Sequence, residues 1–309
     1  MQSLMDLAIF AIATIIVING AHWLVDAVAR LAKKFGVSEI VLGLTVVAFG
    51  TSLPELGVSF VAAVEGHSDI SIGNVIGSNI FNLGFILGLS AFLRPLATSR
   101  VLVYRDGLIL LGITVLLLGV MFDLHVSRWE GILFLLGLVI YLMLLFKQRH
   151  LAGANEEGPG AQPRPSDPLW TLAGLVALIT GSHFAVLSAA NIARDFGLSE
   201  WVIGVTIVAA GTSMPELVTS IVAARKQRFD ISIGNIIGSD IFNQLGIIGI
   251  SASIVPMRVD ASALISVGAL IATVTLVVFM MRTGYQVSRV EGLILFMLAV
   301  ARMGYDLFF

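Results

Sequence analysis

The sequence predicts an all-α integral membrane protein of ten transmembrane helices, arranged as two inverted five-helix repeats. Three observations predict this fold class. The 309-residue chain is 57% hydrophobic, with a mean hydropathy of +0.98. Charged residues make up only 12% of it, against about 25% in soluble domains. Its two halves also repeat one another at a constant spacing.

Apolar segments that are long enough to cross a bilayer, about 20 residues each, occur on both sides of a polar stretch. They lie at about 5–28, 39–64, 69–93, 101–121, 127–146, 168–192, 200–224, 230–254, 261–281 and 287–307. The polar stretch contains Gly158-Pro159-Gly160, which is typical of a flexible linker. We therefore expect a first repeat at 1–146, a linker at 147–167 and a second repeat at 168–309.

The internal repeat has a constant offset of 161 residues. Gly50-Thr51-Ser52-Leu53-Pro54-Glu55 returns as Gly211-Thr212-Ser213-Met214-Pro215-Glu216, and the segment 70–82 returns at 231–243. No insertion is needed anywhere. The most similar parts of the two halves are the segments 39–93 and 200–254.

An odd number of spans in each repeat turns the second repeat upside down relative to the first. The loops between spans 1–2, 3–4, 5–6, 7–8 and 9–10 carry most of the arginine and lysine residues. By the positive-inside rule these loops and the linker are cytoplasmic. Both termini then lie outside an inner or plasma membrane. Inverted repeats are typical of secondary transporters, whose substrate site lies near the midplane on broken helices.

Composition also excludes several classes of function. No basic patch with interleaved aromatic residues is present, so a nucleic acid partner is not expected. The absence of cysteine excludes disulfides and thiolate metal sites. Nothing predicts an enzyme or a resident cofactor. The partners that we expect are the lipid bilayer and transported ions, for a chain that acts as a monomer.

Each repeat carries a proline and a glutamate in the middle of an apolar span. Pro54 has no N–H, so the carbonyl of Gly50 loses its helical partner and the turn bends or unwinds. A carboxylate at that depth is rare and by default functional. The backbone, hydroxyl and carboxylate oxygens of the turn suit Na⁺ or Ca²⁺ better than zinc or copper. A simple kink with a glutamate bonded to a neighbouring helix is the alternative, and the doubling of the motif disfavours it.

The second motif of each repeat predicts a wall that faces the glutamates. Gly73 and Gly77, like Gly234 and Gly238, have the small-xxx-small spacing that lets helix backbones approach. Polar residues follow at intervals of four, on one helical stripe. These stripes are Asn74, Ser78 and Asn82, and Asn235, Ser239 and Asn243. We expect the serine and the second asparagine of each stripe to bind cations, and leave the first asparagine between ligation and interhelical hydrogen bonding.

Asp240 breaks the repeat, because its mate is Asn79. A third acidic residue in a membrane helix should have a use or a partner. Asp240 lies three residues before Asn243, on an adjacent part of the same face. It could join the site, relay protons or pair elsewhere.

The doubled motifs resemble the α-repeats of the calcium/cation antiporter superfamily, and in particular the prokaryotic sodium/calcium exchangers. The resemblance covers essentially the whole chain. It implies exchange of Na⁺ for Ca²⁺ by alternating access, with helices 1 and 6 sliding across the other eight. It also implies a set of cation ligands that includes two backbone carbonyls. The corresponding residues are Glu55, Glu216, Thr51, Ser52, Thr212, Ser213, Ser78, Ser239, Asn82, Asn243, and the carbonyls of Ala48 and Ala209.

One departure from the family pattern leaves the coupling ion open. Many relatives carry Asp at the position of Asn243 and Asn at the position of Asp240, and here the two are exchanged. A Ca²⁺/H⁺ antiporter, in which Glu55, Glu216 or Asp240 cycles protons, is therefore the alternative within transport. A cation channel is the alternative of a different class, although channels line their pores with rings of like residues.

Overall fold

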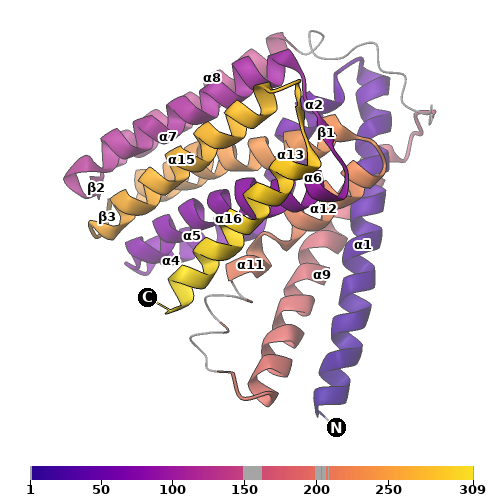
Figure 1. Cartoon of the computed structure of the whole chain (residues 1–309), viewed down its shortest axis with the longest axis horizontal. Helices are drawn as coiled ribbons and strands as arrows, with labels where there is room; N and C mark the ends of the chain where they lie inside the picture. The colour runs from indigo at the N-terminus through magenta and orange to yellow at the C-terminus, as the bar shows by residue number, and fades with distance from the viewer. Residues whose placement is uncertain (1, 149–161, 199–202, 204–206, 208, 309) are drawn as a thin grey trace.

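The computed structural model describes residues 2–148, 162–198, 203, 207 and 209–308, and it is helical over almost all of them. The helices are α1 (Gln2–Phe35), α2 (Glu39–Leu42), α3 (Ala48–Thr51), α4 (Leu53–Val64), α5 (Ser68–Ile80), α6 (Leu87–Leu93), α7 (Leu108–Val120), α8 (Arg128–Lys147), α9 (Asp167–Asp195), α11 (Ala209–Thr212), α12 (Met214–Arg225), α13 (Phe229–Phe242), α14 (Ile248–Ile254), α15 (Ser262–Arg282) and α16 (Arg289–Phe308). Figure 1 shows their arrangement in one bundle.

Short π-helical turns interrupt or precede several of these helices. They are η1 (Gly43–Val47), η2 (Phe81–Ile86), η3 (Leu102–Gly107) and η6 (Asn243–Ile247), and η4 (Met121–Asp123) is a 3₁₀ turn. Three of the π turns adjoin the motifs that carry the predicted site residues. Such turns occur often at functional sites, and the sequence analysis did not predict them.

Two pairs of two-residue strands join the first half of the chain to the second. β1 (Leu96–Ala97) pairs antiparallel with β4 (Gln286–Val287), and β2 (His125–Val126) pairs antiparallel with β3 (Met257–Arg258). The register joins Leu96 to Val287 and Val126 to Met257, so the two ladders relate to each other by the 161-residue offset. The loops at both ends of the bundle are thus tied across the two halves.

Seven helical stretches of the described residues are long and apolar enough to cross a membrane, or eight if the bent pair Glu39–Thr51 and Leu53–Val64 is one span. The chain is therefore an all-helical integral membrane protein. The predicted span at 287–307 corresponds to α16, which does not meet this test, and the span at 200–224 begins in residues outside the description. The ten-span arrangement stays a prediction.

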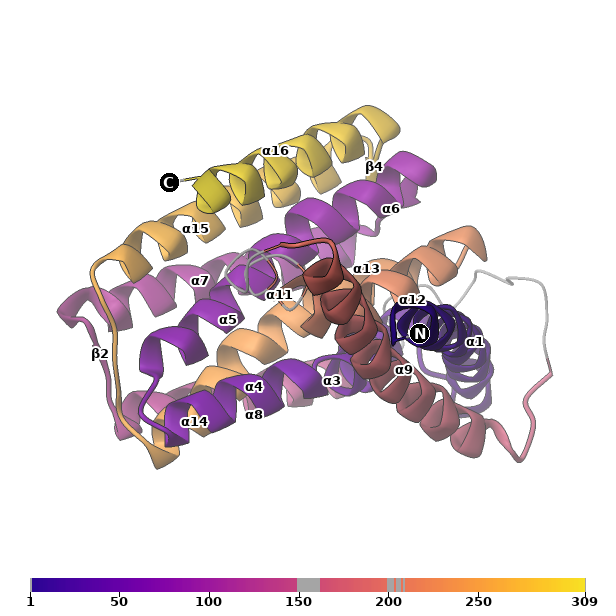
Figure 2. The same ribbon diagram turned by 90° about the horizontal axis from the view of Figure 1, so that it is seen from below.

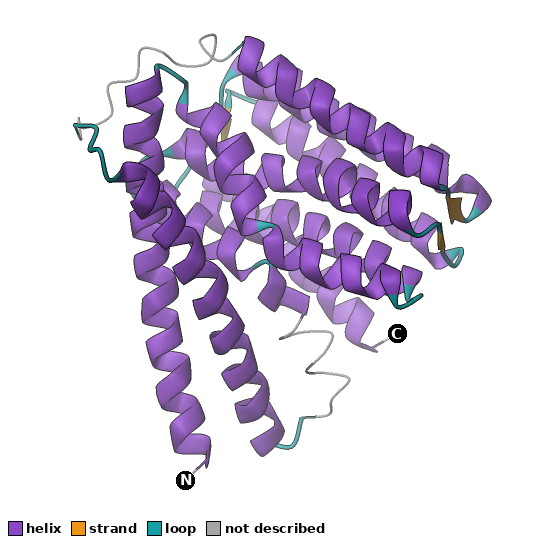
Figure 3. Ribbon diagram, turned by 180° about the vertical axis from the view of Figure 1, so that it is seen from behind, coloured by secondary structure: helices purple, strands orange, loops and turns teal. Residues whose placement is uncertain are grey.

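The two longest helices, α1 and α9, stand side by side at one edge of the bundle (Figure 3). A Cβ on Gly174 would lie 2.8 Å from the carbonyl oxygen of Gly20, so the backbones touch. Arg30 Nε lies 2.6 Å from Asp167 Oδ1. At the other end, Asn191 Nδ2 donates to Asp6 Oδ1 over 3.2 Å. The two contacts are 161-residue mates, and they fasten α1 to α9 at both ends.

α13 lies inside the bundle, against η1 (Figure 2). A Cβ on Gly234 would lie 3.2 Å from Gly43 Cα, so the predicted small-residue spacing does bring two backbones together here. For Gly73 and Gly77, the residues that correspond by the repeat to the partners of Gly234 are 201, 204 and 205, which lie outside the described residues. The same prediction is therefore not tested for that pair.

Candidate cation site

Two broken helices position the two predicted glutamates. α3 and α4 meet at Ser52, where φ is −83° and ψ is 8°, and the axis bends by 49°. Ser213 has nearly the same backbone, φ −86° and ψ 10°, between α11 and α12. Because Pro54 follows the first break, the predicted bend at the proline is confirmed there. Glu55 and Glu216 therefore lie in the first turn of α4 and α12, where the helix dipole favours a negative charge.

The serines at these breaks hold the glutamates of the opposite half. Ser213 Oγ donates to Glu55 Oε1 over 2.9 Å, and Ser52 Oγ donates to Glu216 Oε1 over 2.9 Å. Both carboxylates are fully buried. Neither Oε2 atom has a hydrogen-bond partner among the described residues. Each carboxylate is thus fixed by one oxygen and keeps the other available.

The side-chain amides of the second motif likewise use one atom in hydrogen bonds and leave another without a described partner. Asn82 Nδ2 donates to Asp240 Oδ1 over 3.0 Å, and Asn243 Nδ2 donates to Asn79 Oδ1 over 3.0 Å and to Ser78 Oγ over 3.2 Å. The amide nitrogens are thereby occupied. The amide oxygens of Asn82 and Asn243 and Oδ2 of Asp240 are buried and have no partner in the described part of the chain.

Five buried oxygens from the two halves are therefore left for something else to satisfy. They are Glu55 Oε2, Glu216 Oε2, Asn82 Oδ1, Asn243 Oδ1 and Asp240 Oδ2. An unsatisfied buried polar atom costs about 1–3 kcal/mol, and more if it is charged. Carboxylate and amide oxygens are the hard donors that Ca²⁺ and Na⁺ prefer. This set of five oxygens is our candidate cation site.

Three further predicted residues, Ser239, Thr51 and Ala48, lie close to the candidate site. Ser239 Oγ is 3.4 Å from Glu216 Oε1 and 3.4 Å from the carbonyl of Ala48. Thr51 Oγ1 is 3.3 Å from the same carbonyl and donates to Asn235 Oδ1 over 3.0 Å. The predicted carbonyl of Ala48 is thus surrounded by hydroxyl groups of the site.

Other predicted residues are placed less directly. Ser78 Oγ donates to the carbonyl of Val75 over 3.1 Å, besides accepting from Asn243. Thr212 is half-buried at the end of α11, and Ala209 begins that helix. Within the described residues, no three His, Cys, Asp or Glu side chains come together at metal-binding spacing. Asp240 therefore does not form a three-acid cluster with the glutamates.

Asn74 and Asn235 brace neighbouring helices. Asn74 Nδ2 donates to Ser59 Oγ over 2.9 Å, and Asn235 Nδ2 donates to Ser220 Oγ over 3.0 Å. Each also approaches, at 3.4 Å, the backbone carbonyl of the glutamate in its own half. This is the interhelical alternative of the sequence analysis. The analysis missed the two serines, although they repeat at the same offset, four residues after each glutamate.

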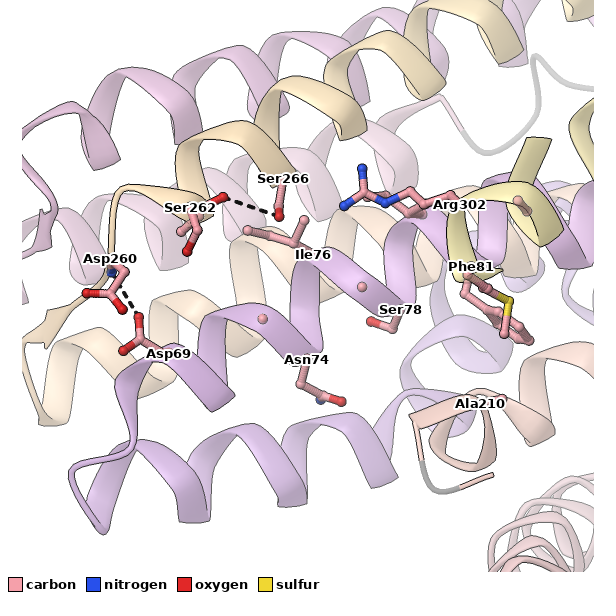
Figure 4. A pocket seen from close by; sticks show the side chains of 16 residues that line it. Asp69, Asn74, Ile76, Ser78, Phe81, Ala210, Asp260, Ser262, Ser266 and Arg302 are labelled. Atoms are coloured by element: carbon pink, nitrogen blue, oxygen red, sulfur yellow. Dashed lines mark hydrogen bonds between the residues drawn. The ribbon is translucent and has the colours of Figure 1, made fainter. Parts of the chain in front are cut away.

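Two cavities approach the candidate site, and many of their lining residues are 161-residue mates. The polar cavity, about 430 Å³, is lined by residues that include Asp69, Gly77, Ser78, Ala210, Asp260 and Arg302 (Figure 4). The apolar cavity, about 340 Å³, is lined by residues that include Phe49, Tyr141, Leu142, Phe146, Gly238 and Phe242. The polar cavity reaches a predicted ligand, Ser78. In the apolar cavity the rings of Phe49 and Phe242 meet edge to face, with centroids 4.9 Å apart.

Comparison with known proteins finds relatives along nearly the whole chain. Residues 5–147 and 167–305 match the family described as sodium/calcium exchanger protein. CaxA of Alkalimonas amylolytica is 37% identical, over 96% of this chain and 95% of that protein. The sodium/calcium exchanger MaX1 of Methanosarcina acetivorans is 33% identical, over 95% and 96%. A solved structure of the sodium–calcium exchanger NCX_Mj has a TM-score of 0.86 and 29% identity, over 98% of this chain and 99% of that one.

Proposed function

The chain belongs to the sodium/calcium exchanger protein family, and from this membership we propose that it exchanges Na⁺ for Ca²⁺ by alternating access. One observation carries the proposal. Both halves of the chain contribute to five buried oxygens that have no partner among the described residues, two of them on glutamates that are each held by the serine of the other half. Such a set is stable only with a cation or a proton among its members.

Competition for the same two charges explains exchange. Glu55 and Glu216 supply two negative charges, which one Ca²⁺ neutralises or which several Na⁺ share over adjacent oxygens. Without an ion, buried charge stays uncompensated, which is costly in a low-dielectric interior. The transition between outward-facing and inward-facing states is therefore slow when the site is empty. That cost favours exchange over leak.

The proposal extends to the arrangement in the membrane. Ten spans form two inverted repeats, 1–146 and 168–309, around a cytoplasmic linker at 147–167. α1 and α9 move together across the remaining helices, which their contacts at both ends support. With the termini outside, the polar cavity opens outward. The protein works as a monomer in the inner or plasma membrane, and the transported ions are the only cations that it requires.

Asp240 supports one second candidate, a Ca²⁺/H⁺ antiporter. It is a third fully buried carboxylate, and its Oδ2 has no partner among the described residues. A proton could take the place of Na⁺ there. The hydrogen bond from Asn82 to Oδ1 instead favours a role for Asp240 in orienting that amide toward the site.

Uptake of ⁴⁵Ca²⁺ into Na⁺-loaded proteoliposomes by the Glu55→Gln and Glu216→Gln variants tests the assignment of the site. Both should lose Na⁺-dependent uptake, because an amide removes one of the two charges and leaves its geometry in place. Glu130→Gln is the matched control. Glu130 caps α8, where its Oε2 accepts from the Ser127 N–H over 2.7 Å, and lies outside the site. Normal uptake by either site variant would exclude the proposal.

A further inference from the structure

A third cavity lies away from the candidate site, between the ends of α6 and α12. It has a volume of about 230 Å³ and is lined by Ser90, Leu93, Arg94, Ile221, Ala224 and Arg225. We call it the two-arginine cavity. Arg94 is the C-cap of α6, and Arg225 is the last residue of α12. Both helices end on the side of the bundle where α1 ends and α9 begins, since Lys226 next to Arg225 contacts Asp26 of α1.

The charge around this cavity is not balanced by its own lining. None of the described residues that line it is acidic. Neighbouring basic residues, in contrast, have acidic partners. Lys226 Nζ lies 2.5 Å from Asp26 Oδ1, and Arg228 Nη1 lies 2.6 Å from Glu39 Oε1. Two arginines, the half-buried Arg94 and the exposed Arg225, therefore line this recess, and no acidic residue is among the described residues that line it.

The side chains are also placed to receive an oxyanion. Arg94 lies over the ring of Phe229, 5.9 Å from its centroid, and its Nη1 approaches the carbonyl of Arg225 at 3.4 Å. These contacts use few of its five donors. Ser90 is fully buried, and its hydroxyl has no partner among the described residues. A phosphate would satisfy the remaining donors of both arginines, and charge-assisted bonds of that kind are the strong ones.

The repeat shows that this chemistry is not required by the fold. The mates of Arg94 and Arg225, 161 residues away, are Val255 and Val64, and the mate of Ser90 is Ser251. At the repeat-related helix ends, valines therefore take the places of both arginines. Leu93 of the cavity and its neighbour Phe92 are both exposed on the outer surface of the helices, where acyl chains lie against a membrane protein.

We propose that the two-arginine cavity binds the phosphate of an anionic lipid headgroup at the membrane surface. Basic recesses between transmembrane helices take such headgroups, and the exposed apolar side chains beside this one favour a lipid over a soluble phosphate. The lipid would bridge α6 to α12, the helix of Glu216. The proposal does not depend on the exchange reaction.

The test measures lipid retained by the purified full-length protein. Wild type, Arg94→Gln/Arg225→Gln and the control Arg100→Gln/Arg282→Gln are incubated with mixed phosphatidylglycerol and phosphatidylcholine, and bound lipid is counted by native mass spectrometry. Arg100 and Arg282 are exposed arginines that do not line the cavity. Wild type and control should retain phosphatidylglycerol selectively. The cavity variant should retain roughly 30-fold less, since each basic residue contributes about 1 kcal/mol, or about fivefold, near an anionic surface.

Two further arms keep the test decisive. Arg94→Lys/Arg225→Lys should recover most of the retention, because it keeps the charge, and it separates loss of binding from loss of folding. Inorganic phosphate is added to compete with the lipid. Displacement by low concentrations of phosphate alone would overturn the lipid source in favour of a soluble one. Equal retention of phosphatidylglycerol by wild type and the glutamine variant would overturn the site itself.

Discussion

The polar cavity and the apolar cavity occupy equivalent places in the two halves of the chain, and their linings differ at equivalent positions. Ala210 lines the polar cavity where its mate Phe49 lines the apolar one. Likewise, Arg302 lines the polar cavity, and its mate Tyr141 lines the apolar one. In Figure 4 the labelled residues of the polar cavity include Asn74, Ser78 and Arg302 as well as Ile76 and Phe81.

The apolar cavity is lined by large apolar side chains and lies beside closely packed helices. The rings of Phe49 and Phe242 meet edge to face, and α13 presses against η1 at Gly43. The mates of the η1 residues, 204–208, lie largely outside the described residues, so the comparison rests on the lining of the two cavities. It teaches that a repeated backbone can carry two cavities of different polarity, because a few side chains differ. Under the proposed exchange cycle, we expect ions to enter through the polar cavity in this state and not through the apolar one.

The largest effect should come from making the polar cavity resemble the apolar one. Ala210→Phe places a ring in the route to Ser78, and Na⁺-dependent Ca²⁺ uptake should fall close to background. Ile265→Phe is the control, since Ile265 is 75% exposed on α15 and does not line the cavity. Flux is measured in proteoliposomes. Unchanged flux in Ala210→Phe would mean that ions use another route.

The serine–glutamate bonds should behave alike in both halves, in contrast to the cavities. Ser52→Ala and Ser213→Ala each remove one hydrogen bond to a buried carboxylate, worth about 1.5–3 kcal/mol. Titration calorimetry should show Ca²⁺ affinity lowered by about tenfold or more in both variants. A large effect from one and none from the other would contradict the symmetric site.

Opening the apolar cavity should be detectable by labelling. The chain has no cysteine, so a single introduced thiol reports alone. Ile80→Cys in the polar cavity should react readily with a membrane-impermeant maleimide, and its mate Ile241→Cys slowly. Adding Phe49→Ala should raise the rate at Ile241→Cys several-fold. Equal rates for the two single-cysteine proteins would refute the asymmetry.

The smallest effect concerns an ion pair that joins the end of α12 to α1. Lys226 pairs with Asp26 of α1, and their mates Glu65 and Leu187 cannot form such a pair. Asp26→Asn should shift the labelling ratio of the previous experiment by about twofold or less, because exposed ion pairs contribute little. A shift as large as that of Phe49→Ala would show that the pair, and not the rings, closes this side.

Much of this molecule could be predicted from its sequence, because the signals are local. Apolar length and the proline before each glutamate predicted the membrane helices and the break at Ser52. The capping box of Ser127 and Glu130 at the start of α8 is local in the same sense, because its two residues are three positions apart. The family that the doubled motifs indicated is confirmed.

What the sequence could not predict depends on contacts between distant segments. The bonds from Ser52 and Ser213 to the glutamates of the opposite halves join residues more than 150 positions apart. The positioning of Asn82 by Asp240 is of the same kind. The approach of Gly234 to Gly43 also joins distant segments, and the spacing of the glycines alone does not identify that partner. That the grouped oxygens bind cations stays a prediction.

The central claim is that Na⁺ and Ca²⁺ compete for one site built by both halves. The most direct test compares Ca²⁺ uptake into proteoliposomes loaded with Na⁺ and into vesicles loaded with choline at the same pH. The account predicts uptake that requires internal Na⁺. Uptake that is indifferent to Na⁺ and driven by an imposed pH gradient would contradict it and assign the coupling to protons, with Asp240 as the first residue to change.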